Sequence, residues 1–375
     1  MYTPKYYITN KVLHFVVKFE MARQSINRIP LPMKERKKLL LSTQSENLYY
    51  MSKITGIDVS LKEAEKIITG KEINVLKMPQ ILLVNYRNAC EFINQMKRDR
   101  YISFSPGTIL HLNKLLTNTW IESWNSGRFR NNQEAPNVQY DRWTTYRDND
   151  KNLVNVQNYL SEVVDWVKET RFLVHPLIKT AVMIYELFNL APFFASNQMT
   201  ILSIIELLYS EFNLSKNKFL TVSRNIYTYE DEYIETMMAA RESGDLTSWI
   251  EKYVRGVSLD TNNIKDQLYQ IEKEKIKQKR ELLLGLNSRQ LQGFNYIKKH
   301  HKITRREYTK ITGVSFMTAY RDLNELEKRS LIFKYGYGRS TYYTSIDQNQ
   351  KNDSGKNVSI YSNVGQLDDL KKIEY

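Results

Sequence analysis

Cysteine is almost absent from this sequence, because Cys90 is the only one in 375 residues. A single cysteine excludes an internal disulfide, and the five histidines lack the spacing of zinc ligands. Long apolar runs are missing too, since polar groups interrupt the most apolar stretch, Phe172 to Phe194, and such groups are costly at membrane depth. We therefore expect a cytoplasmic protein with no metal site, no cofactor and no membrane partner.

Basic residues exceed acidic ones, but unevenly along the chain. The 55 Lys or Arg and 41 Asp or Glu give a net charge of +14, which favours polyanionic partners. Residues 286–345 contain twelve basic and four acidic residues, and so hold +8 of that total. The hydrophobic fraction of 42% is ordinary for a folded protein. The charge therefore indicates one basic segment within an otherwise ordinary globular chain.

Hydrophobic periodicity predicts a mainly α protein. Residues 177–190 and 201–208 are apolar nearly all round, which is typical of helices at the centre of a helical domain. A small β-hairpin is expected only in the basic segment. The expected regions are an N-terminal helical region (1–75), a helical core (76–258), a charged helical connector (259–285), the basic domain (286–345) and a polar tail (346–375). The tail is too poor in apolar residues to fold alone.

The basic domain has the pattern of a helix-turn-helix. Thr304 and Glu307 predict a capping box that starts one helix, Gly313 can end it in the left-handed conformation, and Ser315 caps the next. A hairpin around residues 336–338 follows as a wing. The stretch GVSFMTAYRDLNELEKRSLIFKYGYGRSTYY resembles the winged helix-turn-helix found in many bacterial regulators. The resemblance makes the second helix the candidate recognition helix.

We expect this domain to bind double-stranded DNA. With the apolar positions facing inward, Arg321 and Asn324 lie on the opposite stripe and can read base edges. The expected DNA-binding residues are Arg305, Arg306, Ser315, Thr318, Arg321, Asn324, Lys334 and Arg339, the last two at the tip of the wing. Phe316 and Met317 stand where the resembled domains often have basic residues. Contacts to the DNA backbone are therefore expected to dominate over base-specific contacts at this turn. A protein-docking or dimerisation module is the alternative.

A second resemblance surrounds the loop between the two apolar helices. The segments SGRFRNNQ, HPLIKTAVMIYELF and SGDLTSWIEKYV resemble the Fic family of AMP transferases, over roughly Ile54 to Val257. The family motif HPFxxGNGRxxR, usually with Asp or Glu at its fifth position, aligns with residues 191–202. Only Pro192, Phe193 and Asn197 match it. The loop precedes a helix N-terminus, where free amides and the helix dipole favour an anion.

The residues that carry the family's chemistry are replaced. By this resemblance Ala191 occupies the position of the general base and Ala195 occupies the position of the magnesium-binding acid. Neither alanine side chain can perform that role. The glycines of the anion-binding nest and the two phosphate-binding arginines are replaced in the same way, by Ser196, Gln198, Met199 and Leu202. We therefore expect no catalytic residues in the motif.

Many Fic proteins also carry an inhibitory segment of the form [ST]xxxE[GN]. Residues 42–47 satisfy it literally, but the family context favours the register within MSKITGIDVS. In that register Met51 and Thr55 replace the hydroxyl residue and the glutamate, ahead of Gly56. The resemblance thus implies a degenerate inhibitory segment beside a degenerate motif.

The sequence predicts a non-catalytic Fic-like protein that binds DNA, acting as a bacterial transcription regulator or a signalling adaptor. The alternative is a Fic-type transferase that moves AMP from ATP to a protein hydroxyl through residues outside the motif. A homodimer, and a nucleotide held in the motif loop without turnover, stay open as further partners. The DNA target and the regulated process are not readable from these residues.

Overall fold

The structure is a computed structural model. It describes residues 2–70, 78–99, 101, 103–131, 134–137, 143, 155–214, 220 and 223–345. The chain forms two compact units, residues 1–270 and 271–375. The tail expected at 346–375 lies outside the described residues. Among the helices that the structure describes, none is long and apolar enough to cross a membrane.

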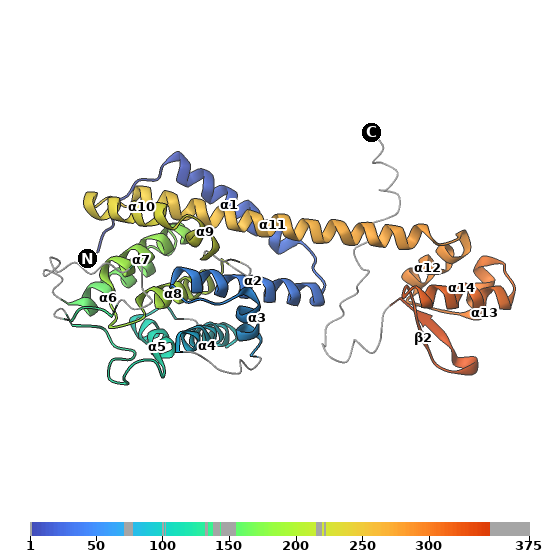
Figure 1. Cartoon of the computed structure of the whole chain (residues 1–375). Helices are drawn as coiled ribbons and strands as arrows, with labels where there is room; N and C mark the ends of the chain where they lie inside the picture. The colour runs from blue at the N-terminus through green and yellow to red at the C-terminus, as the bar shows by residue number, and fades with distance from the viewer. Residues whose placement is uncertain are drawn as a thin grey trace. The chain divides into compact units, whose positions relative to one another are not determined.

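The first unit is helical, as the periodicity predicted (Figure 1). Its helices are α1 (Asn10–Arg28), α2 (Met33–Ile54), α3 (Leu61–Thr69), α4 (Met78–Arg98), α5 (Pro106–Thr117), α6 (Val156–Glu169), α7 (Pro176–Leu190), α8 (Asn197–Glu211), α9 (Ser223–Thr228), α10 (Glu230–Ser243) and most of α11 (Thr247–Leu284). Ser60 and Glu63 form a capping box at the start of α3, and Gly70 ends that helix at φ +69°.

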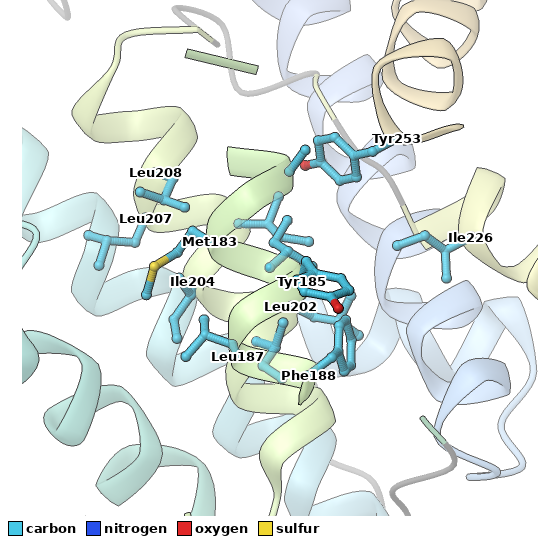
Figure 2. Close-up of a cluster of buried hydrophobic side chains, with 14 of the residues drawn as sticks. Met183, Tyr185, Leu187, Phe188, Leu202, Ile204, Leu207, Leu208, Ile226 and Tyr253 are labelled. Carbon is cyan, nitrogen blue, oxygen red and sulfur yellow. The ribbon is translucent and has the colours of Figure 1, made fainter. Parts of the chain in front are cut away.

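Helices α7 and α8 form the centre of this unit. Nearly all of their residues are buried, in agreement with the all-round apolar pattern. Figure 2 shows Met183 and Phe188 of α7 in one cluster with Leu202 and Ile204 of α8. Each such fully buried side chain contributes about 1.5–3 kcal/mol to the free energy of unfolding. The two helices therefore fix rigidly the loop that joins them, residues 191–196.

The segment before α1 is anchored to this core. Thr9 Oγ1 donates to Glu251 of α11, and Tyr2 Oη donates to the buried Glu186 of α7, both at 2.6 Å. Tyr159 donates to the other oxygen of Glu186 at 2.6 Å. Burial raises the pKa of Glu186, and the two tyrosine hydroxyls oppose that rise. The N-terminal residues thus complete the helical unit.

Helix α11 begins earlier than the sequence suggested. We expected a charged helical connector at 259–285, but α11 starts at Thr247 and its first turns are buried, with Trp249 and Tyr253 at most 1% exposed. Gly256 lies within this helix without interrupting it. A β-carbon at this position would lie 2.2 Å from the Tyr233 hydroxyl of α10. Here glycine permits close packing of two helices and does not mark a boundary.

The described part of the second unit, up to residue 345, contains the end of α11, three further α-helices and a small sheet (Figure 1). Its elements are the end of α11, α12 (Ser288–His300), β1 (Lys302–Thr304), α13 (Arg305–Thr312), α14 (Phe316–Lys328), β2 (Phe333–Tyr335) and β3 (Tyr342–Thr344). The strands are antiparallel in the order β1-β3-β2. The Thr304–Glu307 capping box, the left-handed Gly313 and the Ser315 cap are all confirmed. The hairpin was predicted, whereas β1 was missed.

Candidate nucleic-acid interface and motif loop

A buried polar cluster fixes α14 against the two helices before it. Asp322, in the middle of α14, accepts from Tyr308 Oη of α13 and from Arg289 Nε of α12, both at 3.1 Å. A β-carbon at Gly293 of α12 would lie 2.1 Å from the Tyr308 ring, so these helices touch without an intervening side chain. Burial and the Asp322 carboxylate raise the pKa of Tyr308, which therefore stays protonated and donates.

The opposite face of α14 is open. Arg321 is exposed and Asn324 is half-buried, while Ala319, Leu323 and Leu326 are fully buried on the inner side. The structure therefore brings Arg321 and Asn324 to one side of the helix, as their spacing indicates. Both residue types make paired hydrogen bonds to base edges in the major groove, Arg to guanine and Asn to adenine.

The first turn of α14 is apolar and largely exposed, and one arginine contacts it. Phe316 and Met317 are 55% and 62% exposed. The Arg305 guanidinium at the start of α13 lies over the rings of Phe316 and Tyr320, 5.7 and 4.7 Å from their centroids. Arg305 is thus half-buried in cation–π contacts, whereas Arg306, beside it, is exposed. Both arginines were expected to bind DNA, but their surroundings differ, since only Arg306 has an exposed side chain.

The wing differs in detail from the prediction. Lys334 was placed at its tip, but it lies within β2, paired with Tyr343 of β3, and is exposed. The turn contains a short 3-10 helix, residues 338–340, which includes Arg339. The side chain of Arg339 lies outside what the structure describes. The tip thus begins at Gly336, whose φ of +74° requires glycine because a β-carbon would lie 2.5 Å from the Ser340 carbonyl.

Ser315 and Thr318 were also expected to contact DNA. Ser315 Oγ accepts from the Thr318 backbone N–H at 3.2 Å, which is an N-cap bond of α14, and the two hydroxyls lie 3.0 Å apart. Ser315 is exposed and Thr318 is half-buried. Their demonstrated contacts are therefore structural, while contact with DNA stays a prediction.

In the first unit, the motif loop is held by a buried arginine. Arg130 is 7% exposed. Its Nε donates to Ala191 O at 2.7 Å, its Nη2 donates to Leu190 O at 2.8 Å, and its backbone N–H donates to Pro192 O at 2.9 Å. A guanidinium thus occupies the carbonyls at the C-terminus of α7, where a cation is favoured. Arg130 belongs to the segment SGRFRNNQ, but the sequence alone indicated no role for it.

Buried amides and hydroxyls occupy the remaining carbonyls of the loop. Asn197 makes two hydrogen bonds of 2.9 Å with the backbone of Phe193. Asn113 of α5 donates to Ala195 O at 3.0 Å, and Thr200 donates to Ser196 O at 2.6 Å. Because buried polar groups are costly when unpaired, this bonding fixes one loop conformation.

The replaced motif positions and the retained Asn197 are all buried. Ala191, Ala195, Asn197, Gln198 and Met199 are at most 1% exposed, Leu202 is 3% and Ser196 is 4%. Ser196 keeps φ at +60°, a conformation typical of glycine, although glycine is absent. Leu202, at the position of a phosphate-binding arginine, instead lies in the apolar cluster of Figure 2.

The segment that the resemblance assigns as a degenerate inhibitory segment lies at the end of α2. Met51 and Thr55 are at most 1% exposed, and Thr55 Oγ1 donates back to Met51 O and Ser52 O of its own helix. Gly56 follows at φ +74°. These hydrogen bonds lie within the last turn of α2. Within the described part of the chain, no group of three or more His, Cys, Asp or Glu residues could hold a metal ion.

Comparisons with known proteins agree with both halves of this description. Residues 289–345 match the family model described as a DeoR-like helix-turn-helix domain. A Fic family protein from Desulfovibrio desulfuricans G20 is similar in structure with a TM-score of 0.55 at 15% identity, over 92% of this chain and 98% of that one. Fic-1 from C. elegans is similar with a TM-score of 0.54 at 15% identity, over 70% of this chain and 73% of that one.

A search of the curated proteins finds no match. At 15% identity the structural similarity establishes the fold and leaves the activity open. The chain thus combines the fold of Fic family proteins with a C-terminal DeoR-like helix-turn-helix domain.

Proposed function

We propose that this protein is a non-catalytic Fic-fold scaffold that binds double-stranded DNA through its second unit and regulates transcription. The observation that carries the proposal is the charge of the winged helix together with the contacts of its acidic residues. Twelve basic residues lie between 286 and 345, and most of the four acids there are engaged inside the domain. The local excess of +8 therefore favours a polyanion such as DNA.

Three of these acids have structural partners. Asp322 is buried against Arg289, Glu307 closes the capping box with Thr304, and Glu325 pairs with Arg329 at 2.7 Å. Meanwhile the basic residues at the start of α13, on α14 and on β2 are exposed, namely Arg306, Arg321 and Lys334. DNA affinity arises largely from such exposed cations, which displace counterions from phosphates.

The geometry of α14 favours insertion into the major groove. Arg321 and Asn324 share its outer side, and the helix is fixed from behind by Asp322. Phe316 and Met317 at its first turn are apolar and exposed, so contacts to the DNA backbone are expected to dominate there. We therefore expect Arg321 and Asn324 to read the bases.

The motif loop supports the non-catalytic half of the proposal. AMP transfer needs a base, a metal-binding carboxylate and cations for the phosphates. Alanine stands at the first two positions, and Arg130 is engaged with backbone carbonyls. The motif positions therefore supply neither the base nor the carboxylate.

Fluorescence anisotropy of the full chain on a labelled mixed-sequence duplex tests DNA binding. Kd should rise by more than about tenfold between 50 and 200 mM salt, because several phosphate contacts are lost. The double variant Arg321→Ala, Lys334→Ala should weaken binding by at least about tenfold. The matched control is Lys62→Ala, an exposed charge on α3 of the first unit, which should bind like the unaltered chain. Absent or salt-independent binding would exclude the proposal.

A further inference from the structure

A cavity of about 220 Å³ lies within the first unit, between α2, α4 and α8. Its lining includes Asn47 of α2, Tyr86 and Cys90 of α4, and Tyr209 of α8. It is distinct from the motif loop, because its α8 residues begin at Glu206, roughly 13 Å along the helix from Asn197. None of the functions considered above uses this cavity.

One wall of the cavity contains an amide with an unsatisfied oxygen. Asn47 is 8% exposed, and its Nδ2 donates to Tyr86 Oη at 3.2 Å. Its Oδ1 is buried and has no hydrogen-bond partner among the described residues. An unpaired buried amide oxygen is unfavourable, so this atom requires a donor, and the cavity beside it is where a donor can enter.

The Tyr86 hydroxyl fixes the orientation of that amide. Burial raises the pKa of Tyr86, and the neighbouring Cys90 contributes to the rise. The hydroxyl oxygen accepts from Asn47 Nδ2 at 3.2 Å, so the amide nitrogen is the atom turned toward Tyr86. Asn47 therefore presents Nδ2 to Tyr86 and keeps Oδ1 as an open acceptor.

The size and charge of the lining restrict the occupant. At about 30 Å³ for each water, the cavity has room for roughly seven water molecules, or one small organic molecule. Its charged lining is balanced, since Arg87 and Arg98 are matched in number by Glu91 and Glu206. Apolar side chains such as Ile68, Ile93 and Leu220 share the walls with polar ones, a mixture that suits a small organic molecule with hydrogen-bonding groups. The balanced charge favours a neutral ligand.

We propose that this cavity is a binding site for a small neutral molecule whose N–H group donates to Asn47 Oδ1, such as an aromatic primary amide or the amide edge of a nucleobase. The site adjoins α11, since Tyr209 Oη lies 3.0 Å from Tyr253 Oη of that helix. An occupant therefore contacts Tyr209, whose hydroxyl is paired with Tyr253 of α11, the helix that continues along the chain into the second unit. The proposal does not depend on DNA binding.

Cys90 makes the test specific, because it is the only cysteine of the chain and it lines the cavity. The full chain is equilibrated with disulfide-linked fragments under excess 2-mercaptoethanol, and capture is measured by intact-protein mass spectrometry. Two fragments differ only in carrying a benzamide group or its N,N-dimethyl counterpart, which has no N–H. The benzamide fragment should be captured about tenfold more, the effect of one hydrogen bond.

Asn47→Leu removes the acceptor and should abolish this preference, whereas Ser42→Ala, at an exposed position of the same helix, should keep it. In a second measurement without substitution, soluble benzamide should slow alkylation of Cys90 by iodoacetamide, and N,N-dimethylbenzamide should not. Equal capture of the two fragments, no capture at all, or no protection by benzamide would show a cavity filled by solvent only and would overturn the proposal.

Discussion

The Tyr308 hydroxyl of α13 donates to Asp322 of α14 at 3.1 Å, and this bond joins the two helices of the helix-turn-helix from inside. Arg289 of α12 reaches the same carboxylate, so one buried acid connects three helices. The Gly293 backbone beneath the Tyr308 ring allows that approach. The angle at which α14 is presented thus depends on a polar contact inside an otherwise apolar core.

Replacing that acid should destabilise the second unit selectively. Asp322→Ala leaves the Tyr308 hydroxyl and the Arg289 guanidinium without their acceptor, and we expect the unit to lose about 2–4 kcal/mol. All five tryptophans lie in the first unit. In urea unfolding of the full chain, circular dichroism should therefore show an early partial transition while tryptophan fluorescence stays unchanged. Lys328→Ala, exposed on the same helix, is the control. A single shifted transition in both signals would contradict independent units.

Arg130 should have the opposite spectroscopic signature. Arg130→Met removes the donors to Ala191 O and Leu190 O, so two buried carbonyls lose partners, and we expect a loss of about 2–4 kcal/mol in the first unit. Tryptophan fluorescence should report the change. Arg128→Met is the matched control, because its bonds to Glu134 are partly exposed and its loss should cost less than that of the buried Arg130. Equal effects would mean that the loop carbonyls do not need Arg130.

Asp260 on α11 should make stability depend on pH. Burial raises its pKa to about 7, against the opposing effect of Arg224 and of a bond from the Asn225 backbone. Because the folded value lies above the unfolded value near 3.9, its stabilising contribution is complete below pH about 4 and is lost as pH rises through 7. Asp260→Asn should therefore gain about 1–3 kcal/mol over the unaltered chain at pH 8 and almost nothing at pH 4. A gain that is independent of pH would exclude this explanation.

Local signals in the sequence were sufficient for most of the fold. The capping box at Thr304 and the left-handed end at Gly313 were found because each depends on residues within one turn of helix. The central helices α7 and α8 were identifiable because their burial leaves an apolar pattern on every side. The exposed side of α14 followed from the same periodicity.

The missed features depend on contacts between residues far apart in the chain. Arg130 and Ala191 are separated by 61 positions, and no local pattern indicates that a guanidinium will bind those carbonyls. Asp322 was missed because a charged residue at an inward-facing position looks like surface until Tyr308 and Arg289 are placed beside it. Strand β1 has only three residues, too few for an alternating pattern to be recognised.

Restoring the motif histidine alone should not produce an AMP transferase. Ala191→His provides a base at a position that is 1% exposed, with φ at +43°, and whose carbonyl is held by Arg130. The acid, the glycines and the arginines that would position a nucleotide remain absent, so a lone base has no substrate to deprotonate. Incubation with ATP labelled at the α-phosphate, with and without a cell lysate, should show no more transfer than with Ala191→Asn, which lacks a base but tolerates the backbone. Label that appears only with histidine would show that a nucleotide site persists beside the motif loop.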